Sequence, residues 1–224
     1  MTTTALAATL CWPVPVVMAE CDPAGGVVLS GMLAGRPDLV GSVGLLQATE
    51  IVWEQLIPLD AGGQRRLLPG LSDPGQAVHL DGAWGVIRDL FTHAPFDVIA
   101  DIGRIGGKDT PYPLLTEAAF VVMVLRPTFR SIAAARPRLH ALLRANVQAP
   151  VGLCLVGEGP YNKRTVSSVL GLPVLAEIRE DHTAAGVLSD GRPARRDFGR
   201  SPLMYGAARL VKQMRQPVLE GSPA

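Results

Sequence analysis

Polar side chains follow several apolar segments of this chain, at the point where each segment ends. Continuous apolar runs rich in β-branched residues are typical of strands buried on both faces of a parallel sheet. Ligands bind at the carboxyl ends of such strands, and carboxylates gathered there suit a Mg²⁺–phosphate site. A polar residue follows many buried strands for structural reasons alone. The whole set of residues is therefore stronger evidence for a binding site than any single one. The residues at these ends are Glu20 and Asp22, Asp101, Arg126, Gly157, and Glu180 with Asp181.

Segments that predict strands alternate with segments that predict helices along the chain. The expected strands lack period-two alternation, which predicts an α/β fold with a mostly parallel sheet and helices on both faces. The expected strands are residues 14–19, 65–68, 96–100, 118–125, 151–156 and 173–178. The expected helices are residues 2–10, 27–33, 42–55, 73–92, 131–145, 162–170, 184–188 and 202–214.

Length and composition exclude several classes of protein. The chain has 224 residues, of which 48% are hydrophobic, and a net charge of +1, so it is neither a disordered chain nor strongly drawn to polyanions. We expect a single domain over residues 1–215 and a loose tail over residues 216–224. Three widely spaced cysteines without a CxxC pair indicate a reducing cytoplasm. No apolar run reaches the roughly 18–20 residues of a membrane helix, so we expect no integral membrane segment.

Three motifs in the first half of the chain occur in a defined order. Thr2-Thr3-Thr4-Ala5 opens an expected helix, residues 16–23 form an apolar strand closed by Glu20-Cys21-Asp22-Pro23, and residues 96–101 form another closed by aspartate. They resemble the end of the phosphate-binding loop (G-K-T-T-T-A), the D-x-D-P turn and the Walker B strand of the ParA/MinD family of deviant P-loop ATPases. Glutamate at position 20 replaces the first aspartate of that turn.

The second half of the chain continues this resemblance. Residues 121–127 resemble the strand after Walker B, with its proline. Residues 171–178, followed by Asp181, Ala185 and Gly191-Arg192-Pro193, resemble the family's G-x-P-V-L-G-x-I-P-x-D…A…G-x-P signature. The resemblance covers nearly the whole chain and implies the fold of MinD/ParA-type P-loop NTPases. It is greatest for an actinobacterial MinD-like subgroup, including CpaE/TadZ-like proteins, in which the loop often reads G-x-P-G-V-T-T-T, a degenerate Walker A motif.

The resemblance implies how Mg²⁺ and phosphate would be held. Thr2 would bind Mg²⁺ and Thr3 would contact the α-phosphate, while Asp101 would hold Mg²⁺ through water. The alternative for the two threonines is a helix cap and first turn, which threonine suits well. A lone aspartate that ends a buried strand has few structural reasons to be there, so Asp101 is the strongest single candidate.

The resemblance also implies roles for four further residues. Asp22 would help to position the attacking water, and its alternative is a turn aspartate before proline. Glu20 would support the site from its edge. Gly157 and Glu180 would line the adenine pocket, where the contacts are largely made by the backbone.

The phosphate-binding strand and its glycines are missing from this sequence, which starts at Met1 in the position of the loop lysine or its replacement. In the family that strand lies inside the sheet, so its removal would leave a slot roughly 10 Å wide between its neighbours. Three explanations are open. The recorded start lies after the native one, which we favour because a valine codon in G-V-T-T-T can be a GUG start codon. Alternatively, the chain is N-terminally truncated and no longer binds nucleotide, or the flanking strands pair directly.

The resemblance implies a positioning or chromosome-partitioning factor that binds ATP and Mg²⁺, given an upstream phosphate loop, and switches as a dimer. ATP hydrolysis should be weak or absent, because no lysine stands at position 1 and the cationic candidates are Arg104, Arg126 and Arg130. The alternative is a degenerate, non-hydrolysing scaffold that recruits a secretion, pilus or DNA-segregation machine. A Rossmann-type dinucleotide enzyme is a third alternative, but this sequence contains no G-x-G-x-x-G motif.

The resemblance also suggests partners for the chain. We expect a homodimer, with a secretion or pilus ATPase or a partitioning protein as its partner. Basic residues between Arg192 and Arg215 offer a surface for nonspecific contact with DNA phosphates. The alternative for this segment is a solvated helix face.

Overall fold

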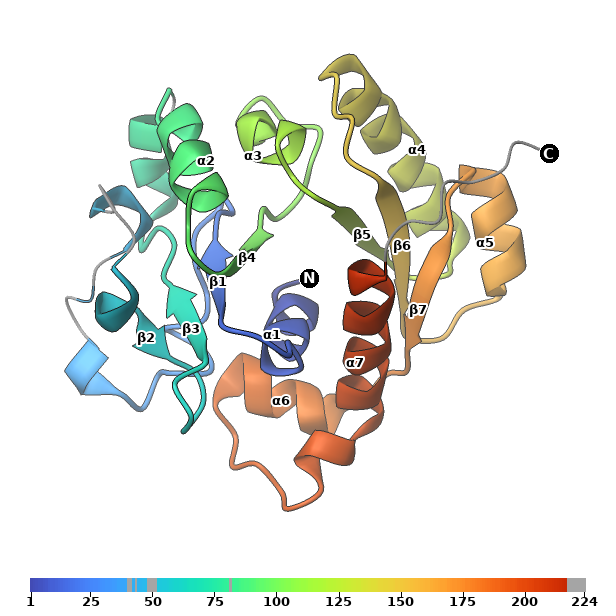
Figure 1. Cartoon of the computed structure of the whole chain (residues 1–224). Coiled ribbons are helices and arrows are strands. Elements are labelled where there is room, and N and C mark those ends of the chain that lie inside the picture. The colour runs from blue at the N-terminus through green and yellow to red at the C-terminus, as the bar shows by residue number, and fades with distance from the viewer. Residues whose placement is uncertain (40–41, 43, 48–51, 81, 217–224) are drawn as a thin grey trace.

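The strands of the protein lie in two sheets with helices packed around them (Figure 1). The computed structural model describes residues 1–39, 42, 44–47, 52–80 and 82–216. The first sheet has the order β2-β3-β1-β4 and the second the order β5-β6-β7, and all pairs are parallel except β2 with β3. The strands are β1 (Val16–Glu20), β2 (Ile57–Pro58), β3 (Arg65–Leu68), β4 (Asp97–Asp101), β5 (Val121–Leu125), β6 (Val151–Val156) and β7 (Val174–Ile178).

Seven α-helices among the described residues surround these strands, which confirms the predicted α/β class. Local sequence fixes several of their ends. Asn162, Asp181 and Ser201 each cap a helix by accepting a hydrogen bond from a backbone N–H in its first turn, as short polar side chains do. The helices are α1 (Thr2–Leu10), α2 (Trp84–Thr92), α3 (Tyr112–Thr116), α4 (Phe129–Arg144), α5 (Lys163–Leu170), α6 (His182–Asp190) and α7 (Pro202–Arg215).

One hydrophobic core joins the two sheets. It contains Leu6 of α1, Met18 of β1, Cys154 of β6, Ile178 of β7 and Leu210 of α7. Helices α1 and α7 thus bridge the sheets, while α2 packs on the first sheet and α4 and α5 pack on the second (Figure 1). The first residues of α1 lie at the strand ends of the first sheet, where Thr2 contacts Asp101.

The pairing of strands is interrupted between β4 and β5. Among the described residues, β4 pairs only with β1 and β5 pairs only with β6, so each is the last strand of its sheet. The alternative in which the two flanking strands pair directly is therefore wrong for this structure. A cavity of about 730 Å³ lies between them, lined by residues of both strands.

Several local expectations were wrong. Residues 27–33, predicted as a helix, form consecutive turns, and residues 73–92 divide into the 3-10 segment Pro74–Leu80 and α2. Within the predicted helix 42–55, the described residues contain two short 3-10 segments and no α-helix. Residues 43 and 48–51 lie outside the described residues, as do residues 217–224 of the predicted tail. Strand β2 and helix α3 were not predicted, because each is very short and contains proline.

Candidate functional site

Thr2 and Asp101, which are separated by almost half the chain, meet at the carboxyl end of β4. The Thr2 hydroxyl donates a hydrogen bond of 2.6 Å to Oδ2 of Asp101. Thr2 is the first residue of α1, and Asp101 is the last residue of β4 and only 9% exposed. The positive end of the α1 dipole therefore faces a largely buried carboxylate, which is a favourable arrangement.

Asp22 lies against the turn that follows Asp101. Its Oδ1 accepts a hydrogen bond of 2.8 Å from the Ala24 amide, so the side chain also supports its own turn. Gly103 packs on the Asp22 carboxylate so closely that an added Cβ would collide with it, and Gly103 has a φ of +65°. The amide of Gly103 donates to Oδ1 of Asp101 at 3.3 Å. The structure thus brings Asp22 next to Asp101, through a glycine whose role the sequence analysis did not identify.

Glu20 holds the loop that follows β1. It is 4% exposed, and its Oε1 accepts hydrogen bonds from the amides of Val27 (2.7 Å) and Val28 (3.0 Å). Burial raises the pKa of this carboxyl above its ordinary value, and the nearby Asp101 adds to the rise, although the backbone donors oppose it. Glu20 is also the register partner of Asp101 across the β1–β4 pair. It therefore lies at the edge of the site, with its oxygens directed to the backbone.

Gly157 and Glu180 lie together at the strand ends of the second sheet, near Arg126. The Arg126 guanidinium donates a hydrogen bond of 2.8 Å to Glu180, and it lowers the pKa of that carboxyl. Gly157 adopts a φ of +76°, and an added Cβ would lie 3.1 Å from Nη1 of Arg126. The predicted site residues thus form two groups, with Thr2, Glu20, Asp22 and Asp101 on the first sheet and Gly157 and Glu180 on the second. Thr3 follows Thr2 in the first turn of α1.

A third polar cluster, at the other end of β4, was not predicted. Oδ2 of Asp97 accepts hydrogen bonds from Nε1 of Trp12 (2.6 Å) and from Arg215 (2.8 Å), and the Arg215 guanidinium lies over the Trp12 ring. These residues are far apart in sequence, so spacing gave no signal of their contact. All three line the cavity between β4 and β5.

The oxygen atoms of Thr2 and Asp101 suit a magnesium ion. Mg²⁺ bound with a nucleotide usually takes one or two protein oxygens and fills its other positions with water and phosphate. Within the described ranges, no group of three or more His, Cys, Asp or Glu side chains is placed to hold a metal ion. The site therefore resembles a shared metal–phosphate site more than a metal site built from protein ligands alone.

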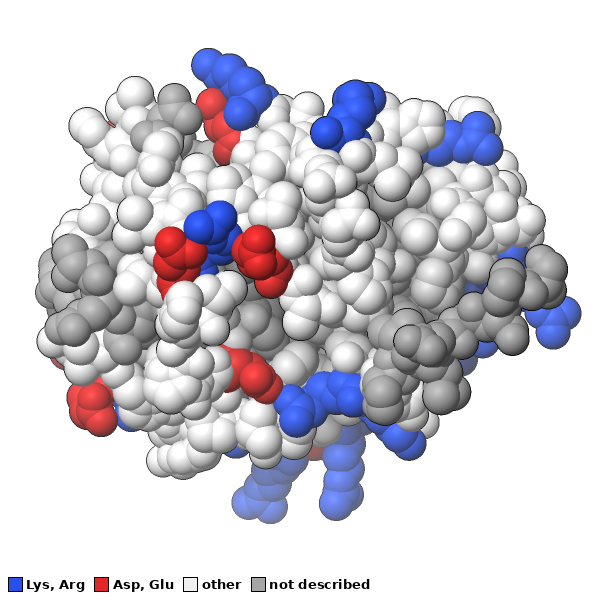
Figure 2. All heavy atoms as spheres, turned by 45° about the horizontal axis from the view of Figure 1, so that its top comes forward, with Lys and Arg blue, Asp and Glu red and all other residues white. Residues whose placement is uncertain are grey.

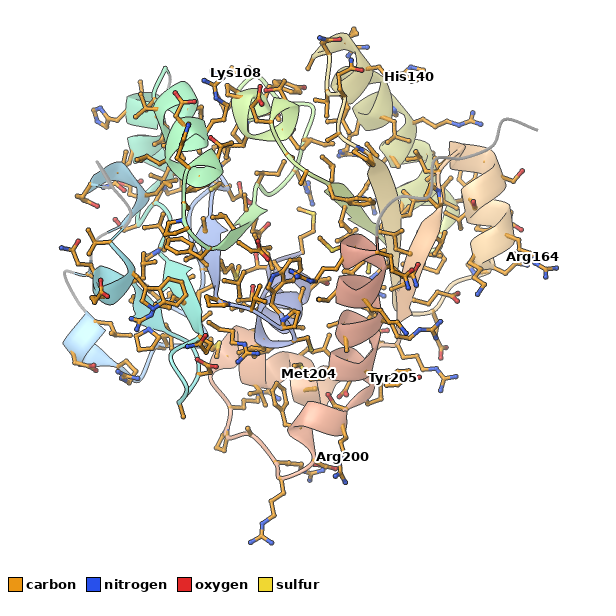
Figure 3. All side chains as sticks on the ribbon, viewed as in Figure 1. Lys108, His140, Arg164, Arg200, Met204 and Tyr205 are labelled. Atoms are coloured by element: carbon orange, nitrogen blue, oxygen red, sulfur yellow. The ribbon has the colours of Figure 1, made fainter. Side chains whose placement is uncertain are left out.

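The basic segment 192–215 is partly neutralised by acidic residues. Arg192 pairs with Asp190 at 3.2 Å and Arg215 pairs with Asp97 at 2.8 Å. Arg200, another basic residue of this segment, lies at the opposite end of the molecule from Lys108 (Figure 3), so these two side chains do not share one surface. On the face turned forward in Figure 2, lysine and arginine side chains are scattered, and one basic group lies between two acidic ones inside the face. No helix of the described residues is long and apolar enough to cross a membrane.

Comparisons with known proteins place the fold. No family model matches the chain, and no curated protein matches it in sequence. Among solved structures it is similar to the septum site-determining protein MinD of Pyrococcus horikoshii, complexed with Mg-ADP, with a TM-score of 0.71 and 17% identity over 96% of this chain and 88% of that one. It is also similar to the MinC:MinD complex of Aquifex aeolicus, with a TM-score of 0.71 and 14% identity over 100% of this chain and 91% of that one.

A ParA family ATPase from Chlorobium tepidum is a further match, with a TM-score of 0.64 and 13% identity over 94% of this chain and 91% of that one. At these identities the likeness concerns the fold. The fold is that of the MinD/ParA P-loop ATPases, as the order of motifs predicted.

Proposed function

We propose that this protein is a nucleotide-dependent positioning or partitioning factor of the MinD/ParA type. The observation that carries the proposal is the hydrogen bond between Thr2 and Asp101 at the strand ends of this fold. A hydroxyl and a carboxylate at a helix N-terminus are suited to Mg²⁺ and phosphate together. The similar Pyrococcus horikoshii protein was solved with Mg-ADP, which supports the same ligand class here.

The two groups of site residues would divide the work of binding. Thr2 and Asp101 would hold Mg²⁺, Thr3 would contact a phosphate, and Glu20 would fix the loop beside them. Gly157 and Glu180 would line the base pocket on the second sheet. ATP and Mg²⁺ would both be bound only where a phosphate-binding loop is present.

Hydrolysis would be slow. Asp22 lies beside Asp101, where it would help to orient a water molecule, and bound Mg²⁺ would offset charge on the phosphates. The three lysines of the chain are Lys108, Lys163 and Lys212, and Lys163 is directed to Glu177 on the second sheet. Without a lysine at the transferring phosphate, the rate would fall by several orders of magnitude relative to a complete P-loop enzyme.

The wider biology follows from the same proposal. Nucleotide binding would promote a homodimer in the cytoplasm and so switch contact with a partitioning partner or a secretion or pilus ATPase. The sequence motifs support an actinobacterial, CpaE/TadZ-like MinD subgroup with a degenerate Walker A loop. Nonspecific DNA contact through 192–215 would use the basic residues that are not taken up by Asp190 and Asp97.

Nucleotide titration of the protein purified from its native source tests the proposal. We expect ATP binding that depends on Mg²⁺ and is weakened at least about tenfold by Asp101→Asn, the loss of one charged ligand. Asp38→Asn, an exposed carboxylate paired with Arg36, is the matched control and should bind like the parent. Equal binding by the Asp101→Asn variant would contradict the assigned site.

A non-hydrolysing scaffold is the second candidate. The interrupted strand pairing between β4 and β5 favours it. A phosphate-binding loop would have to lie beside this interruption, where no strand of the described residues supports it. Such a scaffold would keep the fold and recruit a secretion, pilus or DNA-segregation machine without nucleotide. Native protein that binds no ATP with Mg²⁺, yet is folded, would establish this candidate over the first.

A further inference from the structure

The outer face of α4 is exposed, and a large apolar side chain lies near each of its ends. Helices α4 and α5 pack on each other and form the outermost layer beside the second sheet (Figure 1). Phe129, the first residue of α4, is 73% exposed, and Leu143, in its last turn, is 74% exposed. Single exposed apolar side chains are common in proteins, so what matters is the set of residues between these two.

The exposed residues of α4 follow a regular helical spacing. Between Phe129 and Leu143, exposed side chains occur at Ala133, Arg136 and His140, in steps of four, three, four and three residues. This alternation places the five side chains, here called the α4 stripe, on one narrow line, and it is the spacing by which two helices pack along each other. The stripe is roughly 21 Å long, or about four helical turns. The other exposed residues of α4 lie beside it: Arg130, Pro137 and Arg144.

The centre of the α4 stripe is positively charged and lies in an acid-free segment. No aspartate or glutamate occurs between Glu117 and Glu158, a segment that includes the whole of α4. In the described part of the chain Arg136 forms no ion pair, and its guanidinium donates a hydrogen bond of 3.5 Å to the Val169 carbonyl of α5. Figure 3 shows His140 on α4, on the side of the molecule away from the first sheet. Such a surface favours an acidic partner.

The α4 stripe does not suit every acidic partner equally. A second copy of α4 would set Arg136 against the same residue of that copy in either relative direction, because Arg136 is at the middle of the stripe. Duplex DNA offers phosphates to Arg136 but no apolar surface to Phe129 and Leu143. A membrane would bind best to a wide apolar face, whereas the stripe is polar at its centre. A helix with carboxylates at its centre and apolar ends matches all of these features.

We propose that the α4 stripe binds an amphipathic helix of a partner protein, with Asp or Glu at the centre of its contact face and apolar residues at both ends. A carboxylate of that helix pairs with the Arg136 guanidinium, whose planar fork binds both oxygens at once. Phe129 and Leu143 pack against the apolar ends. The inference goes beyond nucleotide binding and rests on α4. A failure of ATP to bind would leave it intact, and a failure of the helix to bind would leave the proposed nucleotide site intact.

Binding of synthetic helical peptides to the 224-residue chain tests the proposal. The acidic peptide has about three heptads, with leucine at the contact positions of both ends and glutamate at the central contact positions. The control peptide carries lysine in place of those glutamates. Fluorescence anisotropy measures the affinity of both peptides for the parent, for Arg136→Glu and for Leu143→Ala. Arg196→Glu, at an exposed arginine outside α4, is the matched control variant.

The peptides and variants should separate charge from apolar contact. We expect the acidic peptide to bind the parent at least about tenfold more tightly than the lysine peptide, because only glutamate can pair with Arg136. Arg136→Glu should reverse this preference, which a loss of folding could not do. Leu143→Ala should weaken binding of the acidic peptide by roughly three- to tenfold through lost apolar contact, while Arg196→Glu should leave it unchanged.

Three results would overturn the proposal. No binding of the acidic peptide to the parent, or equal binding of the two peptides, would show that the α4 stripe does not select carboxylates. Affinities that are unchanged in Arg136→Glu and Leu143→Ala would place the bound peptide elsewhere on the protein. Vesicles of phosphatidylcholine and phosphatidylglycerol, or a short DNA duplex, that bind through Arg136 more tightly than the acidic peptide would show that the stripe serves a membrane or a nucleic acid instead.

Discussion

Strands β1 and β4 are direct neighbours with similar apolar sequences, yet they are buried to different degrees. Val16, Val17, Met18 and Ala19 of β1 are each 0% exposed, whereas residues 97–100 of β4 are only half-buried. In the described part of the chain, β1 pairs on both edges, with β3 and β4, whereas β4 pairs on one edge. The comparison teaches that an apolar run identifies a strand, while its burial depends on the neighbours that the rest of the chain provides.

The largest expected effect comes from the same substitution in the two strands. Val17 and Val98 are register partners and pack in the same hydrophobic cluster. We expect Val17→Ala to lower the free energy of unfolding by about 2–3 kcal/mol, because a fully buried side chain leaves a void. Val98→Ala should cost about 1 kcal/mol or less, because that side chain already borders a cavity. Urea unfolding measures both, and equal losses would remove the distinction between the strands.

The next test concerns Glu20, the carboxylate that ends β1. Burial raises the pKa of Glu20, so the folded state holds this proton more tightly than the unfolded chain does. The resulting stabilisation is full below the ordinary pKa near 4.5 and is lost as the pH rises through the raised value. The unfolding free energy of the parent, minus that of Glu20→Gln, should therefore decrease with rising pH. Urea unfolding between about pH 4 and pH 7 measures it.

The exposed Glu177→Gln variant is the control for loss of a carboxylate in a strand. A difference between parent and Glu20→Gln that stays constant, or grows as the pH rises, would contradict the assigned environment of Glu20.

The smallest effect is expected at the amino end of β4. Arg215→Gln removes one of the two donors to Asp97, but both charged side chains are more than a third exposed. We expect a loss of about 0–1 kcal/mol in unfolding free energy, which should diminish with added salt. Arg192→Gln, which removes the exposed pair with Asp190, is the matched control. A loss of several kcal/mol would mean that the Trp12–Asp97–Arg215 cluster is more important for joining α7 to β4 than its exposure suggests.

The sequence predicted the elements whose signal is local. Residues 65–68 and 151–156 were predicted as strands with the observed bounds, and Thr2 and Asp101 were assigned to one metal site before their contact was known. Residues 27–33 were predicted as a helix, but the chain forms turns from residue 28 onward, and Glu20 accepts hydrogen bonds from the amides of Val27 and Val28. The apolar residues of this segment gave a helical pattern although no helix forms there.

Contacts between residues that are far apart in the sequence could not be predicted from a sequence pattern. Arg126 and Glu180 are 54 positions apart, and Trp12 and Asp97 are 85 apart, so only the folded chain reveals their pairing. Gly103, two positions after Asp101, packs directly on the Asp22 carboxylate. A glycine can mark such a close approach, but the sequence did not show which residue it would contact. The apolar runs predicted where strands lie but not which strands pair, so the division into two sheets could not be predicted.

Hydrogen exchange of the unmodified 224-residue chain tests the central claim most directly, because it reports the unpaired edges of β4 and β5 amide by amide. We predict that the amides of β1 are among the slowest of the molecule, while amides of β4 and β5 that face the cavity exchange at least about tenfold faster. Protection of β4 and β5 equal to that of β1 would show that the two sheets close on each other, and it would contradict the account.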